Sequence, residues 1–479
     1  MKIKALNEIH KTSIEILETM GMEFPDQVVN KKLVEYGIKV ENGRAYFTEE
    51  QIMELLKKAP SSFTLYARNE KHNILIDMEK THYVAGYGAP KIREFNGDVR
   101  DASLDDYIKL LELVHASDKF NVNGGILVQP ADIKAELSHA IMIYSILTKT
   151  DKGIMSVNGD SKSAKEIMKL MSIVFGGEEE LKSKPRCVTI INSISPLKVD
   201  EAALGCLQVC CKYRQPMAIV PAPMSGSSGP ISVVGNIALA NAEGLALIAL
   251  TQILSPGTPI IYGSAAMTSD MKTGKASIGS PQYPLQSVYA SHLAKMYELP
   301  VRSSGSLTDA YGATIQAGYE GMLSLFAARE EKVNFMIHSA GIVDAFSCMS
   351  FEKFIADLEM ISLLEYYNQD LEVNEKTFAL DVIRDAVKTG TFMTHKHTAK
   401  RCRKDPWQPT ISLRGKLTIN EDPNTLMKKS IDAEMNRLLK SYKTPEMDVE
   451  ILNTLNSYML ELGVDQEVLD RINGKLIEA

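Results

Sequence analysis

From residue 82 onward, the chain repeats one pattern eight times: a short β-branched or apolar run, then a segment of helical length. The short runs span 82–89, 121–128, 153–159, 187–195, 216–223, 259–265, 300–306 and 334–341. The amphipathic segments that follow them span 104–117, 133–147, 163–175, 199–213, 233–254, 285–297, 313–329 and 351–367. Strands that alternate with helices pair in parallel, and eight such units close into a barrel. The sequence therefore predicts an α/β fold, a (β/α)8 TIM barrel.

An open, doubly wound sheet is the alternative arrangement of the same elements. Such a sheet normally carries a phosphate-binding GxGxxG sequence after its first strand. The nearest glycine-rich stretch here, PAPMSGSSGP at 221–230, follows the fifth run and lacks that spacing. This difference favours the barrel.

The regions on either side of the repeats do not show this alternation of apolar runs and helical segments. Residues 1–80 are predicted to form an extension with helices at 4–20 and 48–58, the second opened by a capping box of Thr48 and Gln51. Two β-rich runs that follow, 63–69 and 72–78, can pair as a hairpin, and we expect this region to cover one end of the larger domain. The barrel is expected to span 81–371. Residues 372–479 are expected to form a loop and polar helices that pack on it, and the added terminal helices predict a homo-oligomer.

Composition excludes several classes of protein. The formal net charge of the 479 residues is −7 and no basic run is interleaved with aromatic residues, which argues against nucleic-acid binding. The first 21 residues contain no uninterrupted apolar stretch, so no signal peptide is expected and the cytoplasm is the expected location. The longest apolar segment, 237–254, carries Glu243 at its middle, which would be costly in lipid and indicates a buried helix instead of a membrane span.

The predicted carboxyl ends of the strands, where a barrel of this kind carries its active site, are poor in charged residues. They are Tyr87-Gly88, Gln129-Pro130, Asn158-Gly159, Asn192-Ser193, Pro221–Pro223, Tyr262-Gly263, Ser303–Ser306 and His338-Ser339. Paired carboxylates or a catalytic lysine are therefore not expected. His395 and His397 lie close together in THKHT, but no third residue has metal-ligand spacing, so no metal site is predicted.

Aromatic side chains are the more informative feature of these strand ends. Tyr87, Tyr262 and Phe346 could wall a pocket for a small cation, each ring contributing on the order of 0.5–2 kcal/mol, although core packing is the alternative interpretation for each. Arg302 lies within a strand, and we expect it to form a buried ion pair.

The middle of the chain resembles the trimethylamine methyltransferase (MttB-like) superfamily. The resemblance rests on Gly229-Pro230, LANAEGLA, SPGTPIIYG, SDMKTG, GSPQ, NFMIHSAGIVDAF, SFEKFI, THKHT and the segment around Trp407, and it covers nearly the whole chain. The archaeal trimethylamine enzyme of this family carries pyrrolysine at the end of the eighth strand, a position equivalent to one at or beside His338, where this chain has only standard residues. The resemblance therefore implies the non-pyrrolysine branch, whose members demethylate glycine betaine, proline betaine, carnitine or similar quaternary amines.

For such an enzyme the resemblance implies methyl transfer to the Co(I) corrinoid of a separate corrinoid protein. No cofactor is expected to be bound tightly, since no DxHxxG-type corrinoid-ligand sequence is present. When a quaternary amine gives up a methyl group, the departing amine nitrogen is neutral and needs no general acid, so no side chain is expected to be catalytic. Loops 224–230 and 267–281 are the expected contacts of the corrinoid protein.

The substrate-binding residues follow from the same interpretation. Tyr87 and Phe346 are the preferred rings for the cation, and His338 and His395 are the candidate donors to a carboxylate. The remaining candidates lie in loops after the sixth to eighth strands: Asp309, Asp344, Gln282 and Tyr311. Two alternatives remain open at this point: a non-enzymatic quaternary-amine-binding protein, or a zinc-dependent barrel methyltransferase that would need a His-Cys-Cys ligand set around His338 and Cys348.

Overall fold

Eight parallel strands form a closed barrel at the centre of the computed structural model, which describes residues 2–157, 159–415 and 421–474. In chain order the strands are β6 (His82–Val84), β9 (Phe120–Val122), β10 (Ile154–Met155), β11 (Cys187–Ile191), β12 (Met217–Ile219), β14 (Ile260–Gly263), β17 (Val301–Ser304) and β18 (Phe335–Ile337). Neighbouring strands pair in parallel throughout, and a parallel bridge between Val122 and Gly153 joins β9 to β10. The predicted barrel is confirmed.

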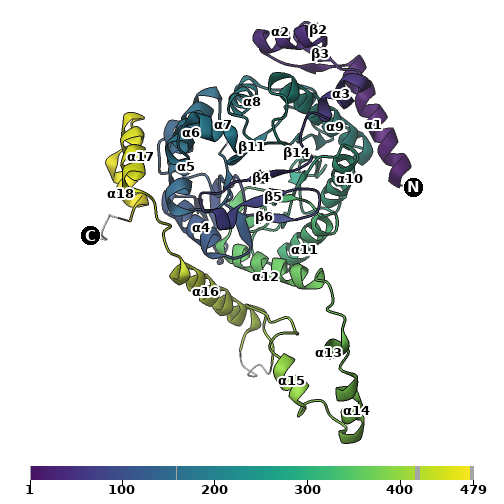
Figure 1. The fold of residues 1–479 in the computed structure, drawn as a ribbon, viewed down its shortest axis with the longest axis vertical. Coiled ribbons are helices and arrows are strands. Elements are labelled where there is room, and N and C mark those ends of the chain that lie inside the picture. The colour runs from purple at the N-terminus through teal and green to yellow at the C-terminus, as the bar shows by residue number, and fades with distance from the viewer. Residues whose placement is uncertain (1, 158, 416–420, 475–479) are drawn as a thin grey trace.

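The predicted helices surround this barrel (Figure 1). They are α4 (Leu104–Ala116), α5 (Ser138–Lys149), α6 (Ser161–Val174), α8 (Glu201–Tyr213), α9 (Val233–Leu254), α10 (Gln282–Met296), α11 (Ile315–Glu330) and α12 (Phe351–Tyr367), with α7 (Glu178–Ser183) as a short addition. Local chemistry fixes several starts: Ser103 and Asp106 form a capping box at α4, and Ser350 caps α12. By length and composition α9 could cross a membrane, but 83% of its apolar window is buried inside the protein.

The amino-terminal region packs on α9 through its helices and covers one end of the barrel through a hairpin. The helices α1 (Lys2–Thr19) and α3 (Glu49–Leu56) appear as predicted, and the capping box at Thr48 is confirmed. The strands β4 (Phe63–Leu65) and β5 (Ile74–Ile76) form an antiparallel hairpin that crosses the barrel in Figure 1. Its apolar side chains join the cluster that fills the barrel interior, so the end where the strands begin is closed. The sequence did not predict α2 (Gln27–Tyr36) or the sheet of β1 (Met22–Glu23), β2 (Lys39–Glu41) and β3 (Arg44–Tyr46).

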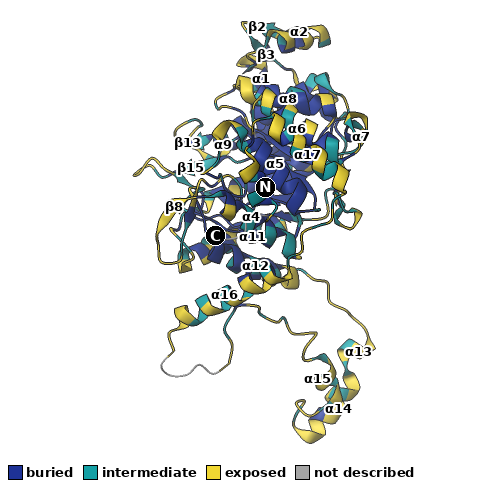
Figure 2. Ribbon diagram, turned by 90° about the vertical axis from the view of Figure 1, so that its left-hand side faces the viewer, coloured by how far each residue is buried: buried dark blue, intermediate teal, exposed yellow. Residues whose placement is uncertain are grey.

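At the opposite end, the loops after the strands form small sheets of their own. One consists of β13 (Met224–Ser225), β15 (Met267–Ser269) and β16 (Ala276–Ser277); the other consists of β7 (Lys91–Arg93), β8 (Val99–Asp101), β19 (Ile342–Val343) and β20 (Cys348–Met349). In Figure 2, β8, β13 and β15 gather on one side of the molecule. These loops are therefore hydrogen-bonded structures at the carboxyl ends of the strands.

The carboxyl-terminal region has two parts. The helices α16 (Pro423–Ser441) and α17 (Val449–Glu461) pack on the barrel helices α4, α12, α5 and α6, and α18 (Gln466–Ile472) follows. Before them, α13 (Glu375–Phe378), α14 (Leu380–Thr389) and α15 (Lys396–Arg401) stand away from the barrel in Figures 1 and 2. We call residues 370–404 the arm. Its exposed large apolar side chains are Leu371, Val373, Phe378, Leu380, Ile383, Val387, Phe392 and Met393.

Candidate functional site

Unusual backbone conformations mark the loop that follows β18. His338 has a φ of +53°, and Asp344, Ala345 and Phe346 have φ of +51°, +48° and +72°. Residues other than glycine rarely adopt this left-handed region. Such strained positions persist where the surrounding structure enforces them, and they cluster at ligand-binding sites. The loop from β18 to β20 is therefore the first candidate for a functional site.

Three predicted side chains meet at this loop. The ring centroids of His338 and Phe346 lie 5.0 Å apart with an interplanar angle of 57°. The rings of Tyr87 and His338 are 6.3 Å apart and nearly perpendicular, at 77°. Tyr87 reaches this position because it follows β6, the strand that pairs with β18. His338 is buried, whereas Tyr87 and Phe346 are half-buried, so two partly accessible rings each contact a buried imidazole.

Hydroxyl groups fix the orientation of the imidazole. The Nδ1 atom of His338 lies 3.1 Å from Ser304 Oγ, which lies 2.7 Å from the hydroxyl of Tyr283 at the start of α10. Burial, and then the positive charge of Arg302, lowers the pKa of His338 well below its ordinary value. The imidazole is therefore neutral near pH 7 and has one donor and one acceptor nitrogen. Ser304 and Tyr283 were not among the predicted binding residues.

Arg302 differs from its prediction. Its side chain is only 2% exposed, but no carboxylate pairs with it among the residues described; Nη1 donates to the carbonyl of Ser264 at 3.3 Å. The predicted buried ion pair is therefore wrong. The reason is the register of the strands. Arg302 pairs with Gly263 of β14 and with Phe335 of β18, and neither of these residues has a carboxylate.

Asp309, Asp344 and Tyr311 line a cavity of about 180 Å³ at the rim of the same end. Asp309 accepts hydrogen bonds from Ser277 Oγ at 2.9 Å and the backbone N–H of Ile278 at 2.8 Å, so it ties neighbouring loops together. Asp344 lies 3.4 Å from an Arg93 nitrogen, and the guanidinium of Arg93 lies 6.0 Å from the ring centre of Tyr311. Since Ala345 also lines this cavity, it adjoins the loop that carries Phe346.

The other predicted residues have different positions. Gln282 is the first residue of α10, and its buried Oε1 has no hydrogen-bond partner within the described ranges. His395 caps α15 on the arm, where its side chain accepts from the backbone of His397, so it does not join the cluster around His338. Asn158, named above at the end of the third run, lies outside the described residues.

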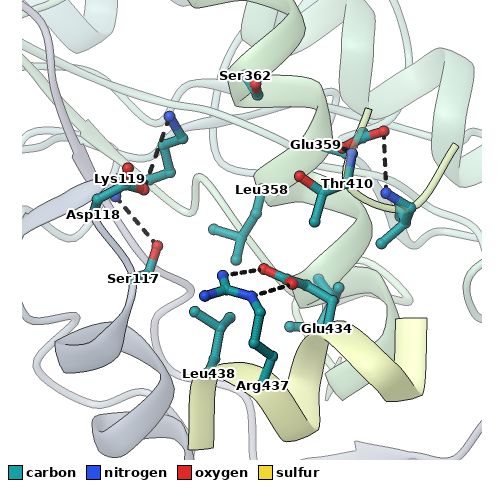
Figure 3. A pocket seen from close by; sticks show the side chains of 12 residues that line it. Ser117, Asp118, Lys119, Leu358, Glu359, Ser362, Thr410, Glu434, Arg437 and Leu438 are labelled. Atoms are coloured by element: carbon teal, nitrogen blue, oxygen red, sulfur yellow. Dashed lines mark hydrogen bonds and ion pairs between the residues drawn. The ribbon is translucent and has the colours of Figure 1, made fainter. Parts of the chain in front are cut away.

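The cavity in Figure 3 lies elsewhere and has a different character. Lys119 and its neighbours immediately precede β9, so this space of about 190 Å³ is at the end where the strands begin. Its charged groups are already paired: Lys119 with Glu365 at 2.6 Å, and Arg437 with Glu434 at 2.6 Å. We interpret it as part of the contact between α12 and α16.

Cysteine and acidic side chains have structural positions at the carboxyl ends of the strands. In the described part of the chain, no three His, Cys, Asp or Glu side chains are grouped as metal ligands. Cys348 pairs in register with Val343 in the β19–β20 hairpin. Glu243 is buried within α9, and it accepts from Ser195 Oγ and from the backbone N–H of Leu197, each at 2.8 Å. This carboxylate therefore holds the loop after β11.

Comparisons with known proteins agree with this architecture. The family described as Trimethylamine methyltransferase (MTTB) matches residues 1–462. A glycine betaine methyltransferase of Desulfitobacterium hafniense (strain Y51) is 38% identical over 458 residues, which are 96% of each chain. A proline betaine:corrinoid methyltransferase of Eubacterium limosum is 27% identical over 466 residues, 95% of each chain. Among solved structures, the monomethylamine methyltransferase of Methanosarcina barkeri has a TM-score of 0.54 at 11% identity, covering 91% of this chain and 87% of that one, a likeness of fold.

Proposed function

Because the chain belongs to the trimethylamine methyltransferase (MTTB) family, we propose that it transfers a methyl group from a small quaternary amine to the Co(I) corrinoid of a separate protein. The relatives named above, and an L-carnitine:corrinoid methyltransferase of Eubacterium limosum that is 25% identical over 476 residues, support this reaction. Glycine betaine is the substrate that we propose, since the relative named for it is 38% identical to this chain.

The aromatic cluster at the carboxyl ends of the strands is the observation that carries the proposal. A quaternary ammonium group has no hydrogen atom to donate, and ring faces attract it through their quadrupoles. Tyr87 and Phe346 offer two such rings next to His338, and both are partly accessible. The strained loop that carries His338 and Phe346 fixes their relative positions.

The proposed reaction makes few chemical demands on these side chains. The departing nitrogen becomes a neutral tertiary amine, so no general acid is required, and the neutral His338 is suited to orienting the substrate. The corrinoid supplies the nucleophile as a second substrate. The residues of this chain hold the cation, orient one methyl group outward and keep water away from it.

We propose that the corrinoid protein docks over the carboxyl ends of the strands. The β4–β5 hairpin fills the opposite end of the barrel. The loops of β13, β15 and β16 lie at the carboxyl ends of the strands, and Gly226 there has a φ of +82°, a conformation that glycine adopts without strain. The same loops were predicted as contacts of the corrinoid protein.

The test combines the purified chain with its corrinoid protein, or with free cob(I)alamin, under reducing conditions. The visible spectrum is followed with glycine betaine, proline betaine, carnitine and trimethylamine. We expect methylation of the corrinoid with a betaine and none with trimethylamine. Betaine binding by calorimetry without methylation of a reduced cognate corrinoid protein would instead indicate a binding protein, and the absence of both would contradict the proposal.

We also propose that the enzyme acts in the cytoplasm, where reduced corrinoids and free thiols persist. Self-association is proposed from two uncovered apolar surfaces. One is the arm, in which Ala386 is the single buried residue among its helices. The other is a stripe on α11 formed by Ile315, Tyr319, Leu323 and Phe326, each at least 37% exposed. A second copy of the chain supplies partners of the same kind for both surfaces.

A further inference from the structure

Arg302 lies inside the barrel, where a charged side chain is unexpected. Its register partner in β18 is Phe335, a member of the cluster that fills the barrel interior, and paired residues of parallel strands point to the same face. Arg302 is 2% exposed. Ser304, two residues further along β17, is on the same face and contacts His338.

The hydrogen-bonding capacity of this guanidinium is only partly used within the described ranges. Of its five N–H donors, one reaches the carbonyl of Ser264 at 3.3 Å, and Nε has no partner. The phenol of Tyr283, which also hydrogen-bonds to the guanidinium, and the phenol of Tyr87 are the neighbours that favour its charge. No acidic side chain among the described residues forms an ion pair with Arg302 within 4.0 Å. Asp309, an acid from the loop after β17, is instead hydrogen-bonded to Ser277 and Ile278.

The charge itself persists despite burial. Burial lowers the pKa of Arg302, but an arginine side chain does not lose its proton at physiological pH. A buried and unpaired cation is strongly disfavoured unless an anion joins it. A carboxylate fits a planar guanidinium well, because two parallel N–H···O bonds form at once.

We propose that Arg302 binds the carboxylate of the substrate, so that the site accepts quaternary ammonium carboxylates and rejects quaternary amines without an acid group. The inference rests on the proposed function and specifies its substrate class. The carboxylate lies against Arg302, and the ammonium group lies by Tyr87 and Phe346, with His338 between them. Ser304, which contacts His338, is two residues from Arg302 on the same strand, a separation of about 7 Å. A site of this length suits a compact zwitterion.

The test is calorimetric titration of the chain with glycine betaine and with choline, which has the same ammonium head but an alcohol in place of the carboxylate. We expect the wild-type chain to bind glycine betaine at least 100-fold more tightly than choline. In Arg302→Met this preference should fall below about threefold, with choline affinity retained. Arg302→Lys should keep a preference for glycine betaine but bind it more weakly, because an ammonium group cannot form the bidentate pair.

Arg186→Met is the matched control. Arg186 is also a mostly buried arginine with an unpartnered Nε among the described residues. It differs in packing on Phe175 and Tyr66, in lying 3.8 Å from Glu180 and in donating to the carbonyl of Ala67, near the end where the strands begin. This variant should keep the full preference for glycine betaine, and its melting temperature calibrates the cost of losing a buried guanidinium.

The outcomes separate the two proposals. If the wild-type chain binds choline and glycine betaine equally, or if folded Arg302→Met keeps the 100-fold preference, the role of Arg302 is refuted and the proposed reaction class stands. If the wild-type chain binds no quaternary amine, both are refuted. If Arg302→Met does not fold, Arg302→Lys decides: unchanged glycine betaine affinity would overturn the bidentate contact, and weaker affinity with unchanged choline binding would support it.

Discussion

Lys353 and Asp357 form a buried ion pair that supports the loop after β18. They lie one turn apart on α12, 2% and 0% exposed at the side chain, with Lys353 Nζ 2.6 Å from Asp357 Oδ2. Asp357 also accepts from the backbone N–H of Gly341 at 2.7 Å and from Ser306 Oγ at 2.8 Å. Since Gly341 follows His338 by three residues, the pair connects α12 to the strained loop of the site.

Removing one partner of this pair should be costly. A single charge left behind in the interior typically costs about 3–5 kcal/mol. The entropy of unfolding is about 2.1 cal/mol/K per residue, which for 479 residues gives about 1 kcal/mol/K if the chain unfolds as one unit. Lys353→Met and Asp357→Asn should therefore each lower the melting temperature by about 3–5 °C. The double variant leaves no charge and keeps an oxygen for Gly341, so it should lose less than about 2 °C.

Scanning calorimetry at one scan rate measures these differences. Lys31→Met is the control, because Lys31 and Glu35 have the same spacing but are 79% and 62% exposed, with 3.8 Å between the charged atoms. It should change the melting temperature by less than about 1 °C. A double variant that loses as much as the two single variants together, or single variants no worse than this control, would refute the account of the pair.

Three further predictions concern other parts of the molecule. Phe346→Ala and Tyr87→Ala should each weaken binding of the quaternary amine about 2- to 30-fold, the equivalent of about 0.5–2 kcal/mol per ring. Tyr87→Phe keeps the ring and should bind normally. Calorimetry that shows no loss for either alanine variant would contradict the role of these rings. Burial lowers the pKa of Lys152 from 10.5 to about 8, so between these pH values the unfolded chain keeps a proton that the folded chain has lost. The free energy of unfolding of the wild type should therefore rise by about 3 kcal/mol relative to Lys152→Met between pH 8 and 10.5. A difference in melting temperature that stays constant over this range would disprove the prediction. Replacing the arm, residues 370–404, with a Gly-Ser linker should lower the molar mass measured by light scattering, and an unchanged oligomer would show that the arm is not the contact.

The barrel could be predicted from the sequence because its signals are local. Alternating runs, helical periodicity and caps such as Ser103 recur with each unit, so no single error changes the fold. Of the missed elements, β1–β3 have two or three residues each, too few to show periodicity, whereas α2 has ten residues with only Val29 and Leu33 buried, a weak apolar pattern.

The candidate site could be predicted only in part. Tyr87, His338 and Phe346 were found because each stands at or after a strand end, and the structure brings their rings together. Arg302 was misinterpreted because the partner of a buried charge depends on the register of distant strands, which a local pattern does not contain. His395 was placed by its motif, but the arm carries it away from the barrel. The substrate-binding roles of these residues stay predictions.

The hairpin of β4 and β5 has a kinetic consequence. It fills the amino-terminal end of the barrel with Phe63, Leu65, Ile74 and Ile76. Small molecules must therefore enter at the carboxyl ends of the strands, where we propose that the corrinoid protein docks. The two substrates should then add in a compulsory order, amine first and corrinoid protein second. Excess corrinoid protein should trap the empty barrel in a dead-end complex, inhibiting turnover competitively with respect to the amine.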